Sequence, residues 1–329
     1  MKITLLGAGA WGTALAIAFA GKNEVTLWSR EADVAVDLRE TRENHRFLPG
    51  HKLPDSVRVE TDFAASLAGA ELLVVSTPIA GLRSTAERLK ELGCTLPLLW
   101  VCKGFEAGPG KLPHQVVAEV LGAKAVCGAL SGPSFAEEVA AGQPTAVTLA
   151  ANDHEFAMNA ARQLHSRRLR IYANDDLIGV EVGGAVKNVL AIATGVCDGL
   201  GLGLNSRAAL MTRGLAEIAR LGVALGAHRD TFMGLAGMGD LILTCTGDLS
   251  RNRRVGLALA KNKSLPQILE ELGHVAEGVY TAREVVRLAG ELEVDMPISK
   301  VIAAVLDGRV SASEALELLM ARDPREEAA

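Results

Sequence analysis

The 329-residue sequence predicts an α/β protein in which a parallel sheet covered by helices is followed by an all-helical second domain. Through the first half, short apolar runs alternate with amphipathic segments, which is typical of strands buried on both faces of a parallel sheet. Beyond Tyr172 the β-branched residues become scarce, and apolar residues recur at helical spacing instead. A chain of this length has room for about two domains. We therefore expect one domain at residues 1–178 and a second at residues 179–329.

The predicted strands of the first domain are apolar runs of four to six residues, with helical segments such as Gly81–Leu92 between several of them. The runs are Ile3–Leu6, Glu24–Trp28, Glu71–Ser76, Leu96–Val101, Ala125–Leu130 and Thr145–Ala150. In the second domain, helical spacing is clearest at Met211, Leu215, Ile218, Gly222 and Leu225. Either Asp175 or Asp176 can cap the first helix of that domain.

Composition excludes several classes of protein. The 39 acidic residues exceed the 34 Lys and Arg, and a net charge of −5 is unfavourable for a nucleic-acid binder, which needs a basic face. The five cysteines form no C-x-x-C pair, so we expect free thiols in a reducing compartment. The uncharged run Ile3–Gly21 resembles a secretory signal, but its glycines are better explained by the turn described next. Asp198 interrupts the best candidate for a membrane span. We expect a soluble, cytoplasmic protein.

The clearest motif is Gly7-Ala8-Gly9-Ala10-Trp11-Gly12, which follows the first predicted strand and opens a helix. In this G-x-G-x-x-G pattern, Gly7 makes the turn, Gly9 lets the backbone approach a pyrophosphate, and Gly12 lets the helix pack on the strand. The helix N-terminus attracts the anion. The pattern predicts a Rossmann-like dinucleotide site, with an ordinary Gly-rich turn as the alternative.

The choice of cofactor depends on the end of the second strand. NAD-specific folds place an acidic residue there to hold the ribose 2′-hydroxyl, whereas this sequence reads Trp28-Ser29-Arg30. Glu31 comes one position later, and we expect it to turn away. Because Arg30 can pair with a 2′-phosphate, we expect NADPH to be favoured over NADH. Arg30 can equally stack on the adenine of either cofactor.

Three polar segments follow predicted strands: Ser76–Pro78, Cys102–Gly104 and Ser131–Phe135. Ligands of open parallel sheets bind at the carboxyl ends of the strands. Lys103 comes directly after an apolar run, so we expect it in the crevice beside the cofactor, although it can also be a solvated loop lysine. The segment Ser131–Phe135 can present N–H groups and hydroxyls to a ligand or be a plain turn.

A single lysine lies within the apolar segment Glu181–Asp198. On a helix, Lys187 shares one face with small residues such as Gly183, Gly184 and Ala191, while the opposite face is bulky and apolar. Burying an unpaired ammonium is costly, so Lys187 either meets an acid or works as an acid/base with a lowered pKa.

Two downstream motifs complete the candidate site. Asp240 lies in a Gly-rich, apolar setting, where it can pair with Lys187 or cap the helix that follows. The run Ser250-Arg251-Asn252-Arg253-Arg254 can be a nucleic-acid patch, a solvated face or a clamp for a small phosphate. It is too small for a duplex, and Arg and Asn suit a phosphate, so we favour the clamp.

Taken together, six ordered motifs resemble those of the bacterial NAD(P)-dependent glycerol-3-phosphate dehydrogenases. They are Gly7–Thr13, Cys102–Gly104, Ser131–Ala136, Gly183–Asn188, Gly237–Asp240 and Ser250–Arg253. The resemblance runs from Lys2 to about Met320. It implies interconversion of dihydroxyacetone phosphate and sn-glycerol 3-phosphate by hydride transfer with NADPH or NADH, which in that family feeds phospholipid synthesis. It also implies a homodimer, and no metal ion is expected.

The resemblance assigns roles to individual residues. Lys187 would be the proton donor and acceptor, with Lys103 and Asp240 completing the polar site. The remaining substrate contacts would be Gly132, Ser134, Ser250, Arg251 and Asn252. Besides the glycines of the turn, the cofactor contacts would be Ala10, Trp11, Arg30, Lys103, Ala136, Arg251, Val275 and Glu277. Ala10 replaces a Ser that some members carry, so one hydroxyl contact is lost.

Two alternatives remain open. One is a related two-domain dehydrogenase of the 6-phosphogluconate or β-hydroxyacid type, which shares the fold and a catalytic lysine. The other is a non-catalytic protein that senses dinucleotides, and the presence of both Lys187 and Arg251-Asn252 argues against it.

Overall fold

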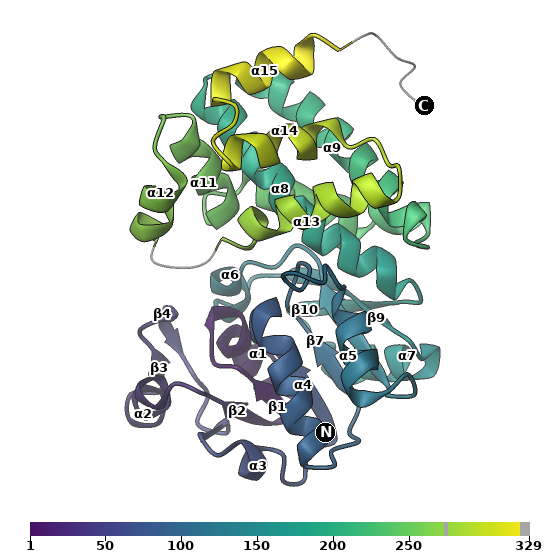
Figure 1. The fold of residues 1–329 in the computed structure, drawn as a ribbon. Helices are drawn as coiled ribbons and strands as arrows, with labels where there is room; N and C mark the ends of the chain where they lie inside the picture. The colour runs from purple at the N-terminus through teal and green to yellow at the C-terminus, as the bar shows by residue number, and fades with distance from the viewer. Residues whose placement is uncertain (273–275, 323–329) are drawn as a thin grey trace.

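The computed structural model describes residues 1–272 and 276–322 and has two parts that follow one another along the chain (Figure 1). The N-terminal part, in the lower half of Figure 1, is built on a sheet, and the described remainder of the chain forms helices above it. The sheet has eight strands in the order β10-β9-β8-β7-β6-β1-β2-β5. Their bounds are β1 Lys2–Leu6, β2 Glu24–Trp28, β5 Arg58–Glu60, β6 Leu72–Val75, β7 Leu98–Trp100, β8 Cys127–Ser131, β9 Thr145–Ala151 and β10 Leu169–Asn174. A separate hairpin pairs β3 (Glu43–Asn44) with β4 (Leu48–Lys52).

The sheet is mostly parallel, as predicted, but one pair is antiparallel. β8 and β9 run in opposite directions, while the other neighbouring strands of this sheet run in the same direction. The connection between them contains only the short helix α6 (Ala136–Ala140), which packs against α1 (Ala10–Ala20). Because α6 does not carry the chain back across the sheet, β9 returns directly beside β8.

Both faces of the sheet are covered. Leu5 and Leu6, adjacent in β1, point into two different apolar clusters. The covering helices of this part are α1, α2 (Ala32–Glu40), α3 (Phe63–Ser66), α4 (Leu82–Glu91), α5 (Pro113–Leu121) and α7 (His154–Leu164), with the 3₁₀ turn η1 (Ile79–Gly81) before α4. This arrangement explains why the central strands are almost entirely apolar.

The second part is organised around α8 (Leu177–Gly199). Of the two candidate caps, Asp176 holds the start of this helix, since its Oδ1 accepts the N–H of Gly179 at 2.8 Å. By length and composition α8 could cross a membrane, but 89% of its most apolar window is buried inside the protein, so it is the core helix. Around it lie α9 (Gly203–Ala224), α10 (Asp240–Thr246), α11 (Arg251–Leu259), α12 (Leu265–Leu272), α13 (Glu277–Glu291), α14 (Pro297–Leu306) and α15 (Ala312–Met320). Between α9 and α10 come the 3₁₀ turn η2 (Arg229–Met233) and the π-helical turn η3 (Leu235–Gly239).

Glycines let α11 approach α8 closely. A Cβ on Gly195 would lie 2.1 Å from the carbonyl oxygen of Arg253, and one on Gly256 would lie 2.1 Å from that of Ile192. Both contacts are with backbone, which cannot swing aside like a side chain. The position of α11 on the core helix therefore depends on these two glycines.

We expect Gly195→Ala to lower the free energy of unfolding by about 1 to 3 kcal/mol, because the methyl group forces α8 and α11 apart. Urea unfolding followed by circular dichroism measures this. The matched control is Gly290→Ala in α13, where a new Cβ meets nothing within 4 Å. That change should be neutral or stabilising by up to about 1 kcal/mol. Equal effects of the two substitutions would contradict the packing argument.

Candidate active site

The three predicted polar side chains meet where the two parts of the chain join. Lys187 comes from the middle of α8, Lys103 follows β7, and Asp240 is the first residue of α10. The Nζ of Lys187 donates to Oδ1 of Asp240, and the Nζ of Lys103 donates to Oδ2 at 2.5 Å. Asp240 therefore pairs with Lys187 and does not cap α10, where no side-chain cap bond is formed.

Thr244 is a site residue that the sequence analysis missed. The Nζ of Lys187 donates to its hydroxyl at 2.9 Å, and this hydroxyl donates to the backbone carbonyl of Asp240 at 2.6 Å. The two residues are four positions apart on α10, which puts them on one helix face. The four-residue spacing in the sequence therefore indicates that Thr244 lies beside Asp240.

Burial lowers the pKa of Lys187. The residue is only 6% exposed and Asp240 only 1%. Desolvation lowers the pKa of Lys187 from its usual value to about 7, with Asp240 opposing the shift and the charge of Lys103 adding to it. An ammonium has three N–H donors, and the contacts to Asp240 and Thr244 use two of them. Lys187 can therefore give or take a proton near neutral pH while one donor stays available for a ligand.

The small residues beside Lys187 make room for its neighbours. A Cβ on Gly184 would lie 2.9 Å from the hydroxyl of Ser131 and 3.4 Å from Cγ of Lys103. A Cβ on Gly183 would lie 2.6 Å from the carbonyl oxygen of Ala236 in η3, the turn that leads into Asp240. The small-residue face of α8 thus brings Lys103 and Asp240 against the helix that carries Lys187.

The three glycines of the Gly-rich turn have different surroundings. Gly7 has φ +125°, a conformation that side chains rarely adopt, and a Cβ on Gly12 would lie 2.0 Å from the carbonyl oxygen of Gly7. Gly9 differs from both, since a Cβ there meets nothing within 4 Å. The backbone at Gly9 is open next to the N-terminus of α1, which fits a bound pyrophosphate.

Arg30 and Glu31 lie beyond the end of β2. The side chain of Arg30 is 78% exposed, and its Nη2 lies 2.9 Å from Oε1 of Glu31. The carboxylate of Glu31 is therefore engaged by the neighbouring guanidinium. An exposed ion pair of this kind contributes little to stability, so Arg30 remains free to exchange partners.

The loop after β8 carries further predicted residues. Gly132 has φ +143°, and its carbonyl accepts bonds from Lys103 Nζ at 3.4 Å and from the Ser134 hydroxyl at 2.9 Å. Ala136 starts α6 and packs in one apolar cluster with Ala10 and Trp11 of α1. This loop therefore links the lysine site to the Gly-rich turn.

The arginine-rich run separates into residues with different partners. Ser250 caps α11, accepting the N–H of Arg253 at 3.3 Å. Asn252 is buried, and its Oδ1 accepts the N–H of Gly278 at 3.0 Å. Arg253 is held by Asp198 and Asp248. Arg251 is exposed and forms no ion pair within residues 1–272 and 276–322, so its guanidinium is free for an anion.

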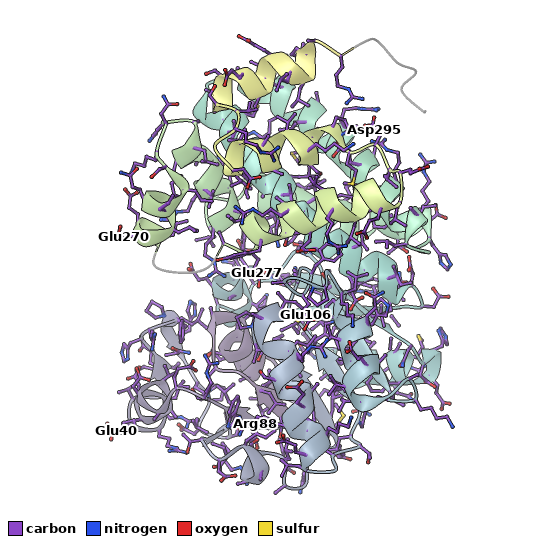
Figure 2. All side chains as sticks on the ribbon, viewed as in Figure 1. Glu40, Arg88, Glu106, Glu270, Glu277 and Asp295 are labelled. Atoms are coloured by element: carbon purple, nitrogen blue, oxygen red, sulfur yellow. The ribbon has the colours of Figure 1, made fainter. Side chains whose placement is uncertain are left out.

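Glu277 starts α13 at the junction of the two parts (Figure 2). It is half-buried, and burial raises its pKa while the charges of Arg251 and Lys103 oppose the shift. These opposing charges put Glu277 in the field of the candidate site. Val275, predicted as a cofactor contact, lies outside the described residues.

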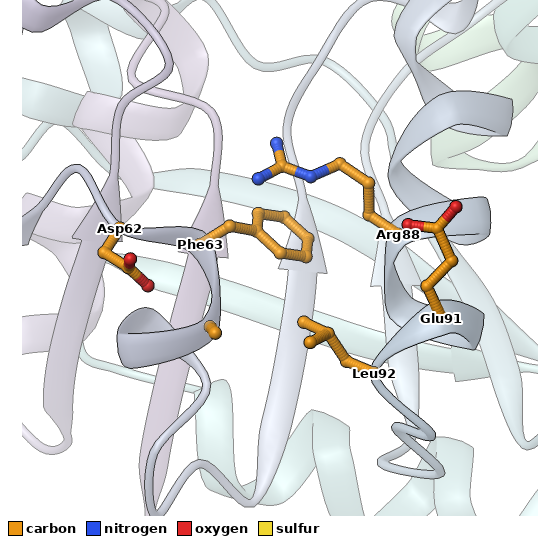
Figure 3. Close-up of a pocket in the computed structure, with 6 residues that line it drawn as sticks. Asp62, Phe63, Arg88, Glu91 and Leu92 are labelled. Atoms are coloured by element: carbon orange, nitrogen blue, oxygen red, sulfur yellow. The ribbon is translucent and has the colours of Figure 1, made fainter.

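A surface recess of about 260 Å³ lies away from these residues, between α3 and the end of α4 (Figure 3). In it the guanidinium of Arg88 lies 4.0 Å from the centre of the Phe63 ring. The other lining residues are Asp62, Ala64, Glu91 and Leu92. No predicted site residue lines this recess.

Comparisons with known proteins agree with the predicted family. Residues 2–157 match the family model "NAD-dependent glycerol-3-phosphate dehydrogenase N-terminus", and residues 176–317 match the corresponding C-terminus. The chain is 83% identical to a glycerol-3-phosphate dehydrogenase [NAD(P)+] of Dechloromonas aromatica, over 100% of both chains. A protein of the same name from Aromatoleum aromaticum is 60% identical, over 99% of this chain and 100% of that protein. The crystal structure of a glycerol-3-phosphate dehydrogenase from Coxiella burnetii is 41% identical, with a TM-score of 0.93, and covers 98% of this chain and 99% of that one.

Proposed function

The chain belongs to the NAD-dependent glycerol-3-phosphate dehydrogenase family, and we propose that Lys187, Lys103 and Asp240 carry out the reaction of this family in it. The protein is an NAD(P)-dependent oxidoreductase that interconverts dihydroxyacetone phosphate and sn-glycerol 3-phosphate. The observation that carries the assignment of roles is the meeting of two lysines on one buried carboxylate at the junction of the two parts.

The Gly-rich turn and the loop after β8 would hold the cofactor. Its pyrophosphate fits over the open backbone of Gly9 at the start of α1, with Trp11 and Ala136 close by. Arg30 would meet the ribose at the end of β2, and Lys103, Arg251 and Glu277 would face the cofactor from the junction. When bound, the nicotinamide supplies a hydride to C2 of dihydroxyacetone phosphate, or accepts it in reverse.

The phosphate of the substrate would bind at the start of α11. Arg251 offers a free guanidinium there, and the helix N-terminus adds its partial positive charge. Asn252 has Oδ1 engaged by Gly278, so its amide NH₂ is the group that faces the phosphate. Ser250, Gly132 and Ser134 would complete the walls of the site.

Lys187 performs the proton step. As the C2 carbonyl of dihydroxyacetone phosphate is reduced, the carbonyl oxygen takes a proton from Nζ of Lys187 and becomes the hydroxyl of glycerol 3-phosphate. In the reverse direction neutral Lys187 takes that proton back. Asp240 and Thr244 hold Nζ in place, while Lys103 and burial keep its pKa near the working pH.

Three finer points belong to this proposal. We infer a cytoplasmic enzyme, which the free state of Cys94, Cys102, Cys127, Cys197 and Cys245 supports. We infer a homodimer, because closed symmetric dimers are the commonest oligomers. We infer that the reductive direction supplies glycerol 3-phosphate for phospholipid synthesis.

One assay tests the activity directly. Purified protein mixed with NADPH or NADH and dihydroxyacetone phosphate should lose nicotinamide absorbance, and glycerol 3-phosphate should accumulate in equal amount. Oxidation of 6-phosphogluconate or a β-hydroxyacid in place of this activity would favour a related dehydrogenase. Tight cofactor binding with no turnover of any of these substrates would favour a dinucleotide sensor.

We expect reductive kcat/KM to fall above about pH 7 and the oxidative value to rise, because the donor is protonated Lys187 and the acceptor is its neutral form. Lys187→Ala should lose about 10² to 10⁴-fold in kcat and show no such pH dependence. Its dissociation constant for NADH, measured by fluorescence titration, should change little. A loss below about tenfold would point to a structural lysine instead.

Arg251→Ala should raise KM for dihydroxyacetone phosphate at least about tenfold, since a charged hydrogen bond contributes about 1.5 to 3 kcal/mol. Steady-state kinetics at saturating NADPH measure this. Arg254→Ala removes an exposed neighbour of the same charge and should leave KM within about twofold, as surface changes usually do. Unchanged substrate binding together with lost RNA binding would support a basic nucleic-acid patch.

We expect NADPH to be used at least as well as NADH, and Arg30→Asp to shift the preference toward NADH. The charge reversal replaces attraction of a 2′-phosphate by repulsion and adds an acceptor for the 2′-hydroxyl. Even with solvent screening, the ratio of the two kcat/KM values should change by about tenfold. A wild type that strongly prefers NADH, with no change in the variant, would mean that Arg30 stacks on adenine or faces solvent.

A further inference from the structure

Arg253 belongs to the arginine-rich run but is not free to bind a ligand. Its Nε and Nη2 donate to Oδ2 of Asp198 at 2.9 and 2.7 Å, and its Nη1 donates to Oδ1 of Asp248 at 3.0 Å. The Arg253 side chain is 12% exposed. The neighbouring Arg251, in contrast, is exposed. Arg251 and Arg253, two of the three arginines in this turn, therefore have different tasks.

Asp198 joins three helices. It lies near the end of α8, and its Oδ2 receives Arg253 of α11. Its Oδ1 lies 3.0 Å from Nε of Arg207 in α9. The side chains of Asp198 and Arg253 are only 10% and 12% exposed, so their ion pair is shielded from solvent and from salt. This pair is also hydrogen-bonded through two nitrogens of Arg253, which makes it strong and directional, in contrast to exposed ion pairs.

These contacts fix the first turn of α11 from several sides. Behind Arg253, the Gly195 contact brings the helix onto α8. Ser250 caps the turn, and Asn252 ties it to Gly278 at the start of α13. Arg251 and Arg254 are the exposed residues of this turn, and the proposed function places the substrate phosphate at Arg251.

We propose that Asp198 and Arg253 are positioning residues that set the enzyme's preference for a phosphorylated substrate. They hold the first turn of α11 so that its N–H groups and Arg251 meet the phosphate dianion in one arrangement. A group organised before binding loses less free energy when the ligand arrives. This inference rests on the proposed function of the same site, and it concerns the phosphate end of the substrate and not the carbonyl end.

The carbonyl end depends on other elements. Lys187 and Thr244 belong to the middle of α8 and to α10, and neither bonds to Asp198 or Arg253. Loosening the first turn of α11 should therefore weaken the grip on phosphate and leave the proton step intact. The kcat/KM value for a substrate without phosphate should therefore stay unchanged.

The test compares dihydroxyacetone phosphate with dihydroxyacetone, which has the same reacting carbonyl and no phosphate. Misplacement by about 1 Å can cost up to about 10²-fold, so we expect Asp198→Asn and Arg253→Met each to raise KM for dihydroxyacetone phosphate by about tenfold. The value of kcat/KM for dihydroxyacetone, measured at high enzyme concentration and saturating cofactor, should stay within about twofold. Arg253→Lys, which keeps the charge but loses the planar fork, should lie between wild type and Arg253→Met.

The matched control is Asp248→Asn. It makes the same change of acid to amide beside the same arginine, but the Asp248 side chain is 96% exposed. We expect its KM for dihydroxyacetone phosphate to stay within about twofold of wild type. Thermal melts of all variants show whether each is folded, and Asp198→Asn, which preserves shape, is the variant expected to remain so.

Equal losses with both substrates would show a general structural role and overturn the inference, and so would an unchanged KM in Asp198→Asn and Arg253→Met. A wild type that does not reduce dihydroxyacetone phosphate would contradict the proposed function instead. The two failures are therefore distinguishable in one set of measurements.

Discussion

The buried carboxylate of Asp240 is the constraint on which the site depends, because it holds two lysines from distant parts of the chain. A buried charge is costly unless it is paired, and here one acid faces two ammonium groups. The pairing keeps Lys187 in place, while desolvation and the charge of Lys103 bring its pKa down to about 7. An ordinary ion pair of one lysine with one acid would stabilise the ammonium and raise that pKa. The second lysine therefore helps to lower the pKa of Lys187, which the proposed role of Lys187 as a proton donor requires.

The cluster of Lys187, Lys103 and Asp240 depends on glycines that let neighbouring segments pack closely against α8. Gly183 and Gly184 admit the turn before Asp240 and the stem of Lys103, while Gly195 and Gly256 bring α11 onto the same helix. α8 is buried on nearly all sides because each of its faces carries one of these contacts. A helix surrounded in this way holds Lys187 on a rigid element, which favours a reproducible distance to a substrate.

The sequence predicted those features that depend on local pattern. The glycine spacing after β1 and the single lysine in an apolar helix located the turn and Lys187 before any packing was known. Features that depend on long-range pairing were missed: the antiparallel direction of β9, and the edge strands β5 and β10. β10 did carry a signal, since Leu169 and Ile171 alternate with exposed residues, but this segment is not a continuous apolar run like the predicted strands. The partners of Arg253 were out of reach for a related reason, because an ion pair between helices leaves no mark in the residue spacing of either helix.

The distribution of partners separates structural polar groups from those that meet ligands. The carboxylate of Glu217 is buried and accepts two backbone N–H groups and one hydroxyl from Ile298 and Ser299, so it has a purely structural task at the start of α14. Arg253 is likewise held by two carboxylates, those of Asp198 and Asp248. Arg251, the open backbone at Gly9 and the third donor of Lys187 differ, because the described part of the chain leaves them without a full set of partners. Folding normally satisfies the polar groups that it buries, and the proposed function assigns the groups left open around this junction to the cofactor and the substrate.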